Sequence, residues 1–240
     1  MSDTVRVALV SEGITDFVVV SAAVDSMLNG RSFDLKLLQP EQSVAFMSSG
    51  DAGPLGGGWK GVYKWCRQAA LRNGGQLRGD PLFLGYDLLI LHLDADVASE
   101  DPANSPVDPL PELAGILPCA GACPPASATT DALRGVLLSW AGESSVPGRT
   151  VFCTPSKSTE AWVMGAIFPE DREMAKRDWE CYANPAGRLA QQPTARRFAK
   201  RRADYEARAS EFRLAWPGIS ARLSEAARFQ DDFLAAVQAL

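Results

Sequence analysis

The sequence predicts an α/β fold in which a mainly parallel β-sheet is flanked by helices and followed by a C-terminal helical extension. The strongest observation is the segment Tyr86–Leu93 (YDLLILHL), which is apolar on both faces, as a central parallel strand is. The chain also opens with an apolar run at Val5–Val10, then a helical pattern, then a second strand pattern. This order favours parallel pairing, because parallel neighbours need a crossover connection. After Pro169 the strand signals stop and charged helical segments begin.

The elements follow one another with recognisable starts and stops. Val5–Val10 is rich in β-branched residues, and we expect a helix from Thr15, which can cap it, to about Leu28. Asp34–Leu38 is the expected second strand. The other expected elements are a glycine-rich loop over Ser48–Gly58, helices over Trp59–Arg72, Asp131–Trp140 and Ser158–Ile167, and a strand over Thr150–Cys153.

Two segments of different character divide the chain. We expect residues 1–168 to form an α/β core and residues 169–240 to form a helical, partly basic extension packed on that core. Prolines are expected to break the helices of the extension near Pro185, Pro193 and Pro217.

Composition excludes several classes of protein. The 240 residues are 46% hydrophobic, which is too apolar for a disordered chain, and no apolar run is long enough to cross a membrane. The net charge of −5 argues against a protein coated in positive charge for non-specific nucleic-acid binding. The N-terminus lacks the pattern of a signal peptide, and five cysteines is an odd number. We therefore expect a cytoplasmic protein with reduced thiols.

Acidic residues come just after three of the predicted strands. Glu12 follows the first strand, Asp94 and Asp96 follow the central one, and Glu160 follows the last after a short loop. Ligands of open α/β sheets bind outside the carboxyl ends of the strands, so these carboxylates should meet at one edge. Asp16, four residues after Glu12, can add a ligand or an outer contact.

Such a cluster needs cations to offset its repulsion, and hard divalent cations prefer oxygen ligands. We therefore expect Mg²⁺ or Mn²⁺, with two ions in the site. Phosphoryl transfer is the chemistry that most needs this arrangement, because the ions activate water and stabilise the leaving oxygen.

Simpler interpretations stand beside these. Glu12 can be an acid at a helix start, favoured by the helix dipole, and Ser158 with Glu160 can be a helix cap. His92 is the only histidine, so no histidine-rich zinc site can form, and we expect a packed core residue with support of the acidic site as the alternative. Cys119 and Cys123 lack the further ligands that a zinc site needs.

A basic stretch lies in the C-terminal segment with no acid between its members. It can be a solvated helix face or a wall that binds nucleic-acid phosphates beside the acidic cleft. Its residues are Arg188, Arg196, Arg197, Lys200, Arg201 and Arg202.

Three motifs carry a resemblance to a known family. The segments VALVSEGITD and LLILHLDAD resemble the Toprim domain of topoisomerases, bacterial primases and OLD-type nucleases. Ser158-Thr159-Glu160 is similar to the S-x-E element of OLD-type nucleases, and STEAW resembles stand-alone Toprim-like proteins of bacterial defence islands. The similarity covers roughly residues 5–168 as scattered motifs.

The resemblance implies a Rossmann-like core and a Mg²⁺- or Mn²⁺-dependent nuclease that cleaves DNA or RNA in antiphage defence. It implies that Ser158 and Asp16 support the acidic ligands, and that a downstream lysine acts in catalysis. Lys200 is the expected lysine, with Lys176 and Lys157 as alternatives. The metal ligands it implies are Glu12, Asp94, Asp96 and Glu160.

The chain departs from the family in having no P-loop motif and no tyrosine arranged as in a topoisomerase. A separately encoded ATPase is therefore the expected partner, and the sequence leaves a homo-oligomer open. Two other functions stand as alternatives. One is a non-catalytic Toprim-like module that binds nucleic acid or a partner, and the other is a different Mg²⁺-dependent phosphoryl-transfer enzyme, such as a phosphatase.

Overall fold

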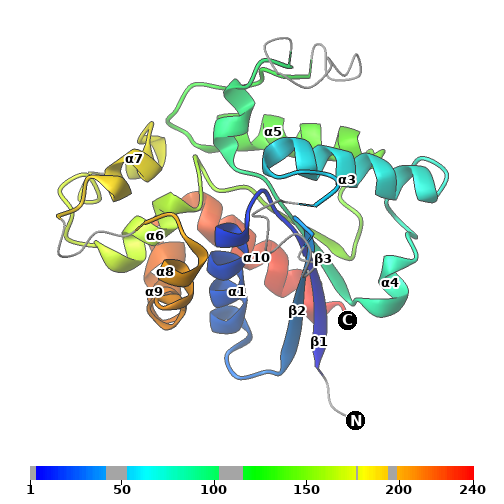
Figure 1. The fold of residues 1–240 in the computed structure, drawn as a ribbon, viewed down its shortest axis with the longest axis horizontal. Coiled ribbons are helices and arrows are strands. Elements are labelled where there is room, and N and C mark those ends of the chain that lie inside the picture. Colours follow the sequence, from blue (N-terminus) through cyan, green and yellow to red (C-terminus); the bar gives the residue numbers. More distant parts are fainter. Residues whose placement is uncertain (1–3, 42–52, 103–115, 177, 194–198) are drawn as a thin grey trace.

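A four-stranded parallel sheet forms the centre of the molecule, which confirms the α/β class. The structure is a computed structural model that describes residues 4–41, 53–102, 116–176, 178–193 and 199–240. The strand order is β2-β1-β3-β4, and all three pairings are parallel (Figure 1). The strands are β1 (Val5–Val10), β2 (Phe33–Gln39), β3 (Leu88–His92) and β4 (Thr150–Cys153).

Helices surround this sheet, and most of the expected ones form close to their predicted bounds. In the first two thirds of the chain they are α1 (Ile14–Leu28), α3 (Gly58–Arg72), α4 (Leu82–Gly85), η1 (Ala95–Ser99), α5 (Ser127–Ala141) and α6 (Glu160–Ile167). In the last third they are η4 (Trp179–Cys181), α7 (Pro185–Ala190), α8 (Arg202–Glu206), α9 (Ala209–Arg222) and α10 (Ser224–Gln238).

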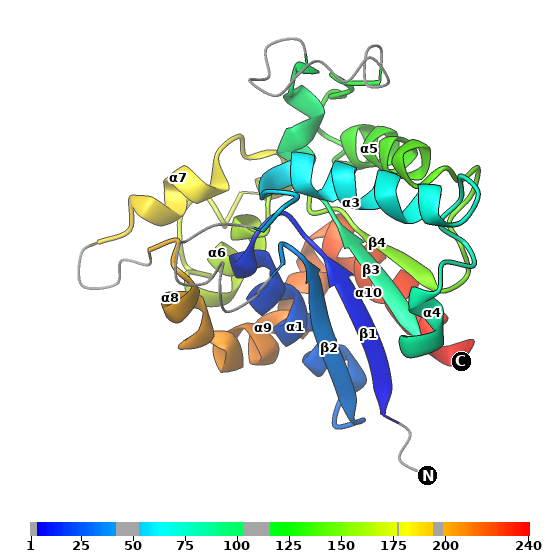
Figure 2. The ribbon, with the colours of Figure 1, turned by 45° about the vertical axis from the view of Figure 1, so that its right-hand side comes forward.

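The alternation of side chains along the strands divides the interior into two cores. Val7 and Leu9 of β1 belong to the core under α1, α6, α9 and α10, whereas Ala8 and Val10 belong to the core under α3 and α5. The two groups of helices lie on opposite faces of the sheet (Figures 1 and 2). Because both faces are covered, the strands can be apolar throughout.

The C-terminal helices contribute to one of these cores directly. Trp216 of α9 packs edge-on against Trp162 of α6 with ring centroids 5.2 Å apart, and Phe229 of α10 stacks on Trp162 at 6.1 Å. The same apolar cluster holds residues of β1, β3 and β4. Residues 209–240 therefore complete a layer of the fold.

Two local expectations are wrong. Pro217 lies inside α9 and does not end it, since buried Trp216 and Ile219 on either side keep the helix packed on the core. Thr15 does not cap α1. Gly13 occupies the cap position, and the Asp16 carboxylate accepts a hydrogen bond from the Gly13 N–H at 2.9 Å, which satisfies a donor at the helix start.

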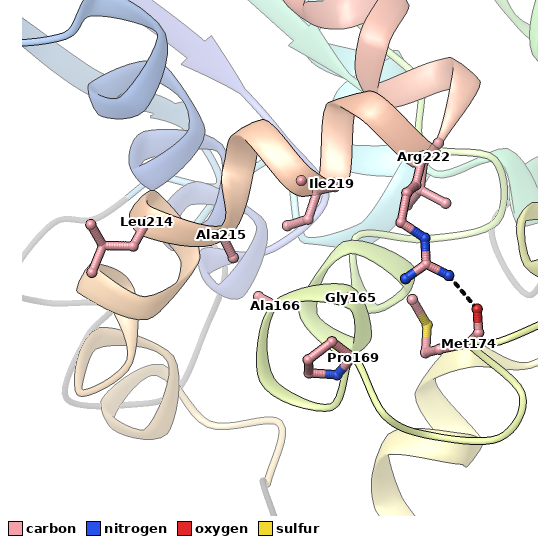
Figure 3. A pocket seen from close by; sticks show the side chains of 10 residues that line it. Gly165, Ala166, Pro169, Met174, Leu214, Ala215, Ile219 and Arg222 are labelled. Atoms are coloured by element: carbon pink, nitrogen blue, oxygen red, sulfur yellow. Dashed lines mark hydrogen bonds between the residues drawn. The ribbon is translucent and has the colours of Figure 1, made fainter.

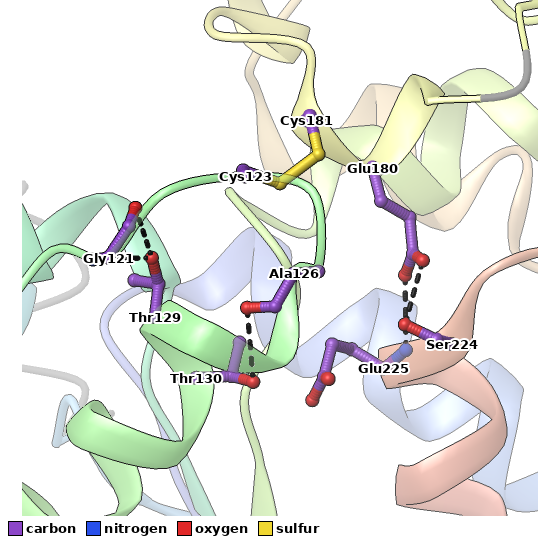
Figure 4. Close-up of a disulfide and its surroundings, with 9 residues drawn as sticks. All are labelled: Gly121, Cys123, Ala126, Thr129, Thr130, Glu180, Cys181, Ser224 and Glu225. Carbon is purple, nitrogen blue, oxygen red and sulfur yellow. Dashed lines mark hydrogen bonds between the residues drawn. A yellow bond between two sulfur atoms is a disulfide. The ribbon is translucent and has the colours of Figure 1, made fainter.

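A disulfide joins Cys123 to Cys181, 58 residues further along the chain (Figure 4). The expectation of reduced thiols is therefore wrong for these two cysteines, although Cys66 and Cys153 are free and buried. The bond ties the segment before α5 to η4. Beside it, Glu180 accepts hydrogen bonds from the Ser224 hydroxyl and the Glu225 N–H at the start of α10.

Among the residues that the structure describes, none of the helices has the length and apolar character needed to cross a membrane.

The strand order also creates a reversal point in the sheet. From β1 the chain crosses to β2 on one side, and β3 then pairs with the other side of β1. Ligands of open α/β sheets bind at such a point, outside the carboxyl ends of the two strands. Glu12 and Asp94 follow β1 and β3 there.

Candidate metal centre

Glu12 and Asp94 are in direct contact at the reversal point of the sheet. The Glu12 Oε1 atom accepts a hydrogen bond from the Asp94 N–H at 2.8 Å. Val10 and Leu91 are paired across β1 and β3, so Glu12 and Asp94 follow their strands at nearly the same level of the sheet. The prediction that these two strand-end acids converge is confirmed.

His92 joins this pair from the last position of β3. Its side chain is fully buried, and Nε2 lies 3.2 Å from Asp94 Oδ1. Neither ring nitrogen makes a hydrogen bond of acceptable geometry to any described residue. One ligand atom each from Glu12, His92 and Asp94 lie within 4.8 Å of one another. A single cation with bonds of about 2.0–2.2 Å spans such a set after small side-chain movements.

A hydrogen bond between Asp16 and Thr159 links the start of α1 to the start of α6. One oxygen of the Asp16 carboxylate holds the Gly13 N–H, and the other accepts the Thr159 hydroxyl hydrogen bond at 2.7 Å. The Thr159 N–H donates in turn to Asp94 Oδ1 at 3.1 Å. Both Asp16 oxygens are thus engaged, and the residue links α1, α6 and the end of β3.

Glu160, the first residue of α6, forms a second acidic position. It is buried, and its Oε1 atom lies 2.7 Å from Lys200 Nζ and accepts a hydrogen bond from the Tyr205 hydroxyl at 3.3 Å. Its Oε2 atom has no hydrogen-bond partner among the described residues. Of the three lysines expected from the sequence, Lys200 contacts the acidic cluster, whereas Lys176 pairs with Glu173.

Asp96 and Ser158 complete the set of expected residues. Asp96 lies in the first turn of η1 with its side chain exposed, and its N–H donates to the Lys157 carbonyl. Ser158 is buried, and its hydroxyl has no hydrogen-bond partner among the described residues. It does not cap α6, since Thr159 occupies the cap position without a side-chain cap bond.

The electrostatics of the cluster follow from burial and crowding of like charges. Burial, and then the charge of Asp94, hold the pKa of Glu12 well above its usual range. Burial, and then the charges of Asp16, Glu160 and Asp96, raise the pKa of Asp94 well above its usual range. Although Asp96 as a whole is exposed, neighbouring atoms partly shield its carboxylate from water, and this shielding, followed by the charge of Glu160, raises the pKa of Asp96.

Lys200 reverses this trend at Glu160. Burial alone would raise the pKa of Glu160, but the charge and hydrogen bond of Lys200 outweigh it and lower that pKa. Burial works against the Lys200 ammonium, yet attraction to Glu160, Asp16 and Asp94 raises the pKa of Lys200 above its usual value. The lysine therefore stays charged and pairs with Glu160, and its weaker attraction to Asp94 does not offset the burial and like charges that raise the pKa of Asp94.

The residues at this site fit a divalent cation. Buried polar atoms normally have a hydrogen-bond partner, and clusters of exceptions call for an ion or water. Here both ring nitrogens of His92 lack a hydrogen-bond partner among the described residues, next to two carboxylates whose repulsion a cation would relieve. Glu12, Asp94 and His92 would hold the ion, with Asp96 and Glu160 close by.

The basic stretch is only partly described. Arg196 and Arg197 lie outside the described residues. Arg201 is largely exposed and lies 3.5 Å from Asp204, and Arg202 forms an ion pair with Glu206 at 2.7 Å.

Arg188 is set apart from the rest of that stretch. It forms an ion pair with the partly buried Asp171, with Arg188 Nη2 2.8 Å from Asp171 Oδ2. Lys200, by contrast, contacts Glu160 of the acidic cluster.

A separate apolar cavity of about 310 Å³ lies between α6 and α9 and includes none of the acidic residues (Figure 3). Leu214 and Ile219 of α9 face Ala166 and Pro169 across it. Arg222 at one end donates to the Met174 carbonyl. The lining is apolar apart from Arg222, and it holds no carboxylate that could bind a metal ion.

Sequence reasoning gives His92 a supporting role at the site only as the alternative to a packed core residue, because it lies inside an apolar strand. It does not identify Thr159 or Tyr205. Thr159 is the middle residue of the S-x-E element, a position at which the motif specifies no residue type. Tyr205 could not be found, because nothing in the sequence tells where α8 packs.

No family model matches the chain, and searches of curated proteins and of solved structures return no significant match.

Proposed function

We propose that the protein is a divalent-metal-dependent nuclease of the Toprim type that hydrolyses phosphodiester bonds in DNA or RNA. The observation that carries the proposal is the contact of Glu12 with Asp94 at the reversal point of the sheet, beside buried unpartnered polar atoms and a charged lysine. Buried acids that meet from separate strands repel one another, and a group of ionisable residues with strongly shifted pKa values is typical of a functional site.

Each residue has a distinct part in this proposal. Glu12, Asp94 and His92 hold the cation, and Asp16 with Thr159 fixes the orientation of Asp94. The cation would polarise a phosphoryl oxygen and lower the pKa of a water that attacks phosphorus. The Lys200 ammonium, kept in place by Glu160, would offset charge that develops on the phosphoryl oxygens. Asp96, which is exposed two residues after Asp94, can take part in a second cation position.

The direct test is cleavage of supercoiled plasmid and of single-stranded RNA with Mg²⁺ or Mn²⁺, with EDTA as the blank. The variants Glu12→Gln and Asp94→Asn keep the hydrogen-bond acceptors but remove charge, so we expect cleavage to fall by at least about 100-fold. The control is Asp131→Asn. Asp131 is an exposed acid of α5, and it forms an ion pair with Arg228 of α10. Undiminished cleavage by both site variants would refute the assignment.

The same assay separates the alternatives. Hydrolysis of p-nitrophenyl phosphate without cleavage of bis-p-nitrophenyl phosphate or nucleic acid would indicate a phosphatase. Binding of nucleic acid with no metal-dependent hydrolysis would indicate a binding module.

We also propose, from the sequence resemblance alone, that the enzyme acts in antiphage defence in the cytoplasm with a separately encoded ATPase. Its test is phage plating on cells that carry the chain with its neighbouring genes. Protection that disappears with Asp94→Asn would support the proposal, and protection unaffected by that change would contradict it.

A further inference from the structure

His92 lies at the end of β3, close to the acidic residues of the site. Along β3, Leu88 and Ile90 face the core under α1 and α6, so the alternation of the strand places His92 on the same face, level with its partner Cys153 on β4. The start of α1 carries Asp16 and the start of α6 carries Glu160, on the same face. The imidazole therefore stands at the strand end among the acids, between the two helix starts.

The surroundings of His92 leave its ring nitrogens without a hydrogen bond. The side chain is fully buried, and neither ring nitrogen has a hydrogen-bond partner among the described residues. A histidine that serves only as packing usually satisfies at least one nitrogen, because an unpaired buried polar group costs roughly 1–3 kcal/mol. The Asp94 Oδ1 atom lies 3.2 Å from His92 Nε2, and it is itself a candidate ligand atom.

We infer that His92 is a nitrogen ligand of the cation and that it makes the site prefer Mn²⁺, or a similar transition-metal ion, over Mg²⁺. This inference rests on the proposed metal centre and adds the identity of its ion. Mg²⁺ takes oxygen ligands almost exclusively, whereas imidazole suits first-row transition metals. One nitrogen with two carboxylates thus favours ions that accept both donor types.

The first experiment compares binding of Mn²⁺ and Mg²⁺ to the tag-free full chain by calorimetry. His92→Gln places an amide group where Nε2 stood, so we expect the preference for Mn²⁺ over Mg²⁺ to narrow by at least about tenfold. Cys153→Ala changes a buried side chain at the same level of the sheet without removing a nitrogen, and should leave the preference unchanged. If His92 only orients Asp94 as an outer partner, both affinities fall together and the inference is wrong.

The second experiment needs no variant and so does not depend on the folding of His92→Gln. Because His92 is the only histidine of the chain, any imidazole nitrogen coupled to bound Mn²⁺ in pulsed electron paramagnetic resonance must be His92. We expect the coupling of a directly bonded nitrogen in the wild-type protein. Mn²⁺ bound without that coupling would overturn the inference and leave the proposed function standing. No Mn²⁺ binding at all would overturn both.

Discussion

The N–H of Asp94 donates to the Glu12 carboxylate at 2.8 Å, and this bond joins the ends of the two strands that flank the reversal point of the sheet. The contact brings together residues 82 positions apart in the chain. It holds one carboxylate oxygen of Glu12 in place.

Removing the Asp94 charge should stabilise the metal-free protein. Asp94→Asn retains an acceptor for the Thr159 N–H but ends the repulsion with Glu12, Asp16 and Glu160. We expect the free energy of unfolding to rise by roughly 1–2 kcal/mol, since one unit of pKa corresponds to about 1.4 kcal/mol. Urea unfolding in EDTA measures the change.

A matched buried acid outside the site gives the control for that experiment. Glu143 is buried and accepts hydrogen bonds from the backbone and side chain of Arg78 at 2.6 Å. Glu143→Gln should therefore lower stability by about 1–3 kcal/mol and leave metal binding unchanged. A site variant that destabilises as strongly as Glu143→Gln would contradict the claim that the site acids repel one another.

The stability of the metal-free protein should depend on pH with a specific sign. The pKa values of Glu12 and Asp94 are raised in the folded protein, so the folded state binds more protons than the unfolded state above about pH 4. Stability therefore falls as pH rises from the unfolded-state pKa through the raised folded-state values. Glu160, whose pKa is lowered, contributes stability above about pH 4 that is lost below it.

Unfolding of wild type and Asp94→Asn between pH 4 and 8 measures this dependence, and the slope should be smaller in the variant. Because a cation displaces the same protons, Mn²⁺ binding should weaken as pH falls and should release protons. Calorimetry in buffers of different ionisation enthalpy counts those protons. A flat stability profile together with no proton release would argue against the raised pKa values.

Lys200 should matter for catalysis and not for metal affinity. Lys200→Met removes a positive charge next to the acids, so Mn²⁺ should bind at least as tightly as in the wild type. Cleavage should nevertheless fall by at least about 100-fold, since a charge that stabilises the transition state is lost. Lys176→Met is the control, because Lys176 pairs with Glu173 instead. Two results would contradict a catalytic role for Lys200. One is an equal loss of cleavage in Lys200→Met and Lys176→Met, and the other is weaker Mn²⁺ binding to Lys200→Met than to the wild type.

Tyr205 should act through Glu160. Its buried hydroxyl donates to Glu160 Oε1, the oxygen that also faces Lys200. Tyr205→Phe keeps the ring that packs near Phe212 but frees Glu160 to reorient. We expect a loss of cleavage smaller than in Lys200→Met, roughly 3–30-fold, with stability changed by about 1 kcal/mol. Activity equal to wild type would show that the hydroxyl has no positioning role.

The disulfide should contribute to stability through the unfolded state. Joining residues 58 positions apart removes about 4 kcal/mol of chain entropy in the loop-closure model. The double variant Cys123→Ser, Cys181→Ser should unfold at lower urea than the oxidised wild type and should match the wild type under reducing conditions. Cys119→Ser, which changes a free cysteine of the same region, should have little effect. Identical oxidised and reduced wild-type curves would mean that the bond does not form in solution.

The sheet and the main acids could be predicted because their signals are local. The apolar run before Asp94 and the β-branched run before Glu12 identify buried strands, and parallel strands necessarily bring their carboxyl ends to one edge. Asp16 was placed near the site for the same reason, but its hydrogen bonds to Gly13 and Thr159 depend on how two helices start.

Other features depend on contacts between distant segments, which no local pattern encodes. The approach of Tyr205 to Glu160 follows from the packing of α8, and the pairing of Cys123 with Cys181 follows from the path of η4. Helix α9 continues through Pro217 because its packing on α6 outweighs the lost hydrogen bond.

The central claim is that Glu12 and Asp94 hold a divalent cation at the reversal point of the sheet. Anomalous diffraction from a crystal of the protein soaked in Mn²⁺ tests it most directly. We predict a peak within roughly 2.0–2.6 Å of a carboxylate oxygen of each residue, the range of such metal–oxygen bonds. A peak elsewhere on the molecule, or fully occupied sites that avoid both carboxylates, would contradict the account.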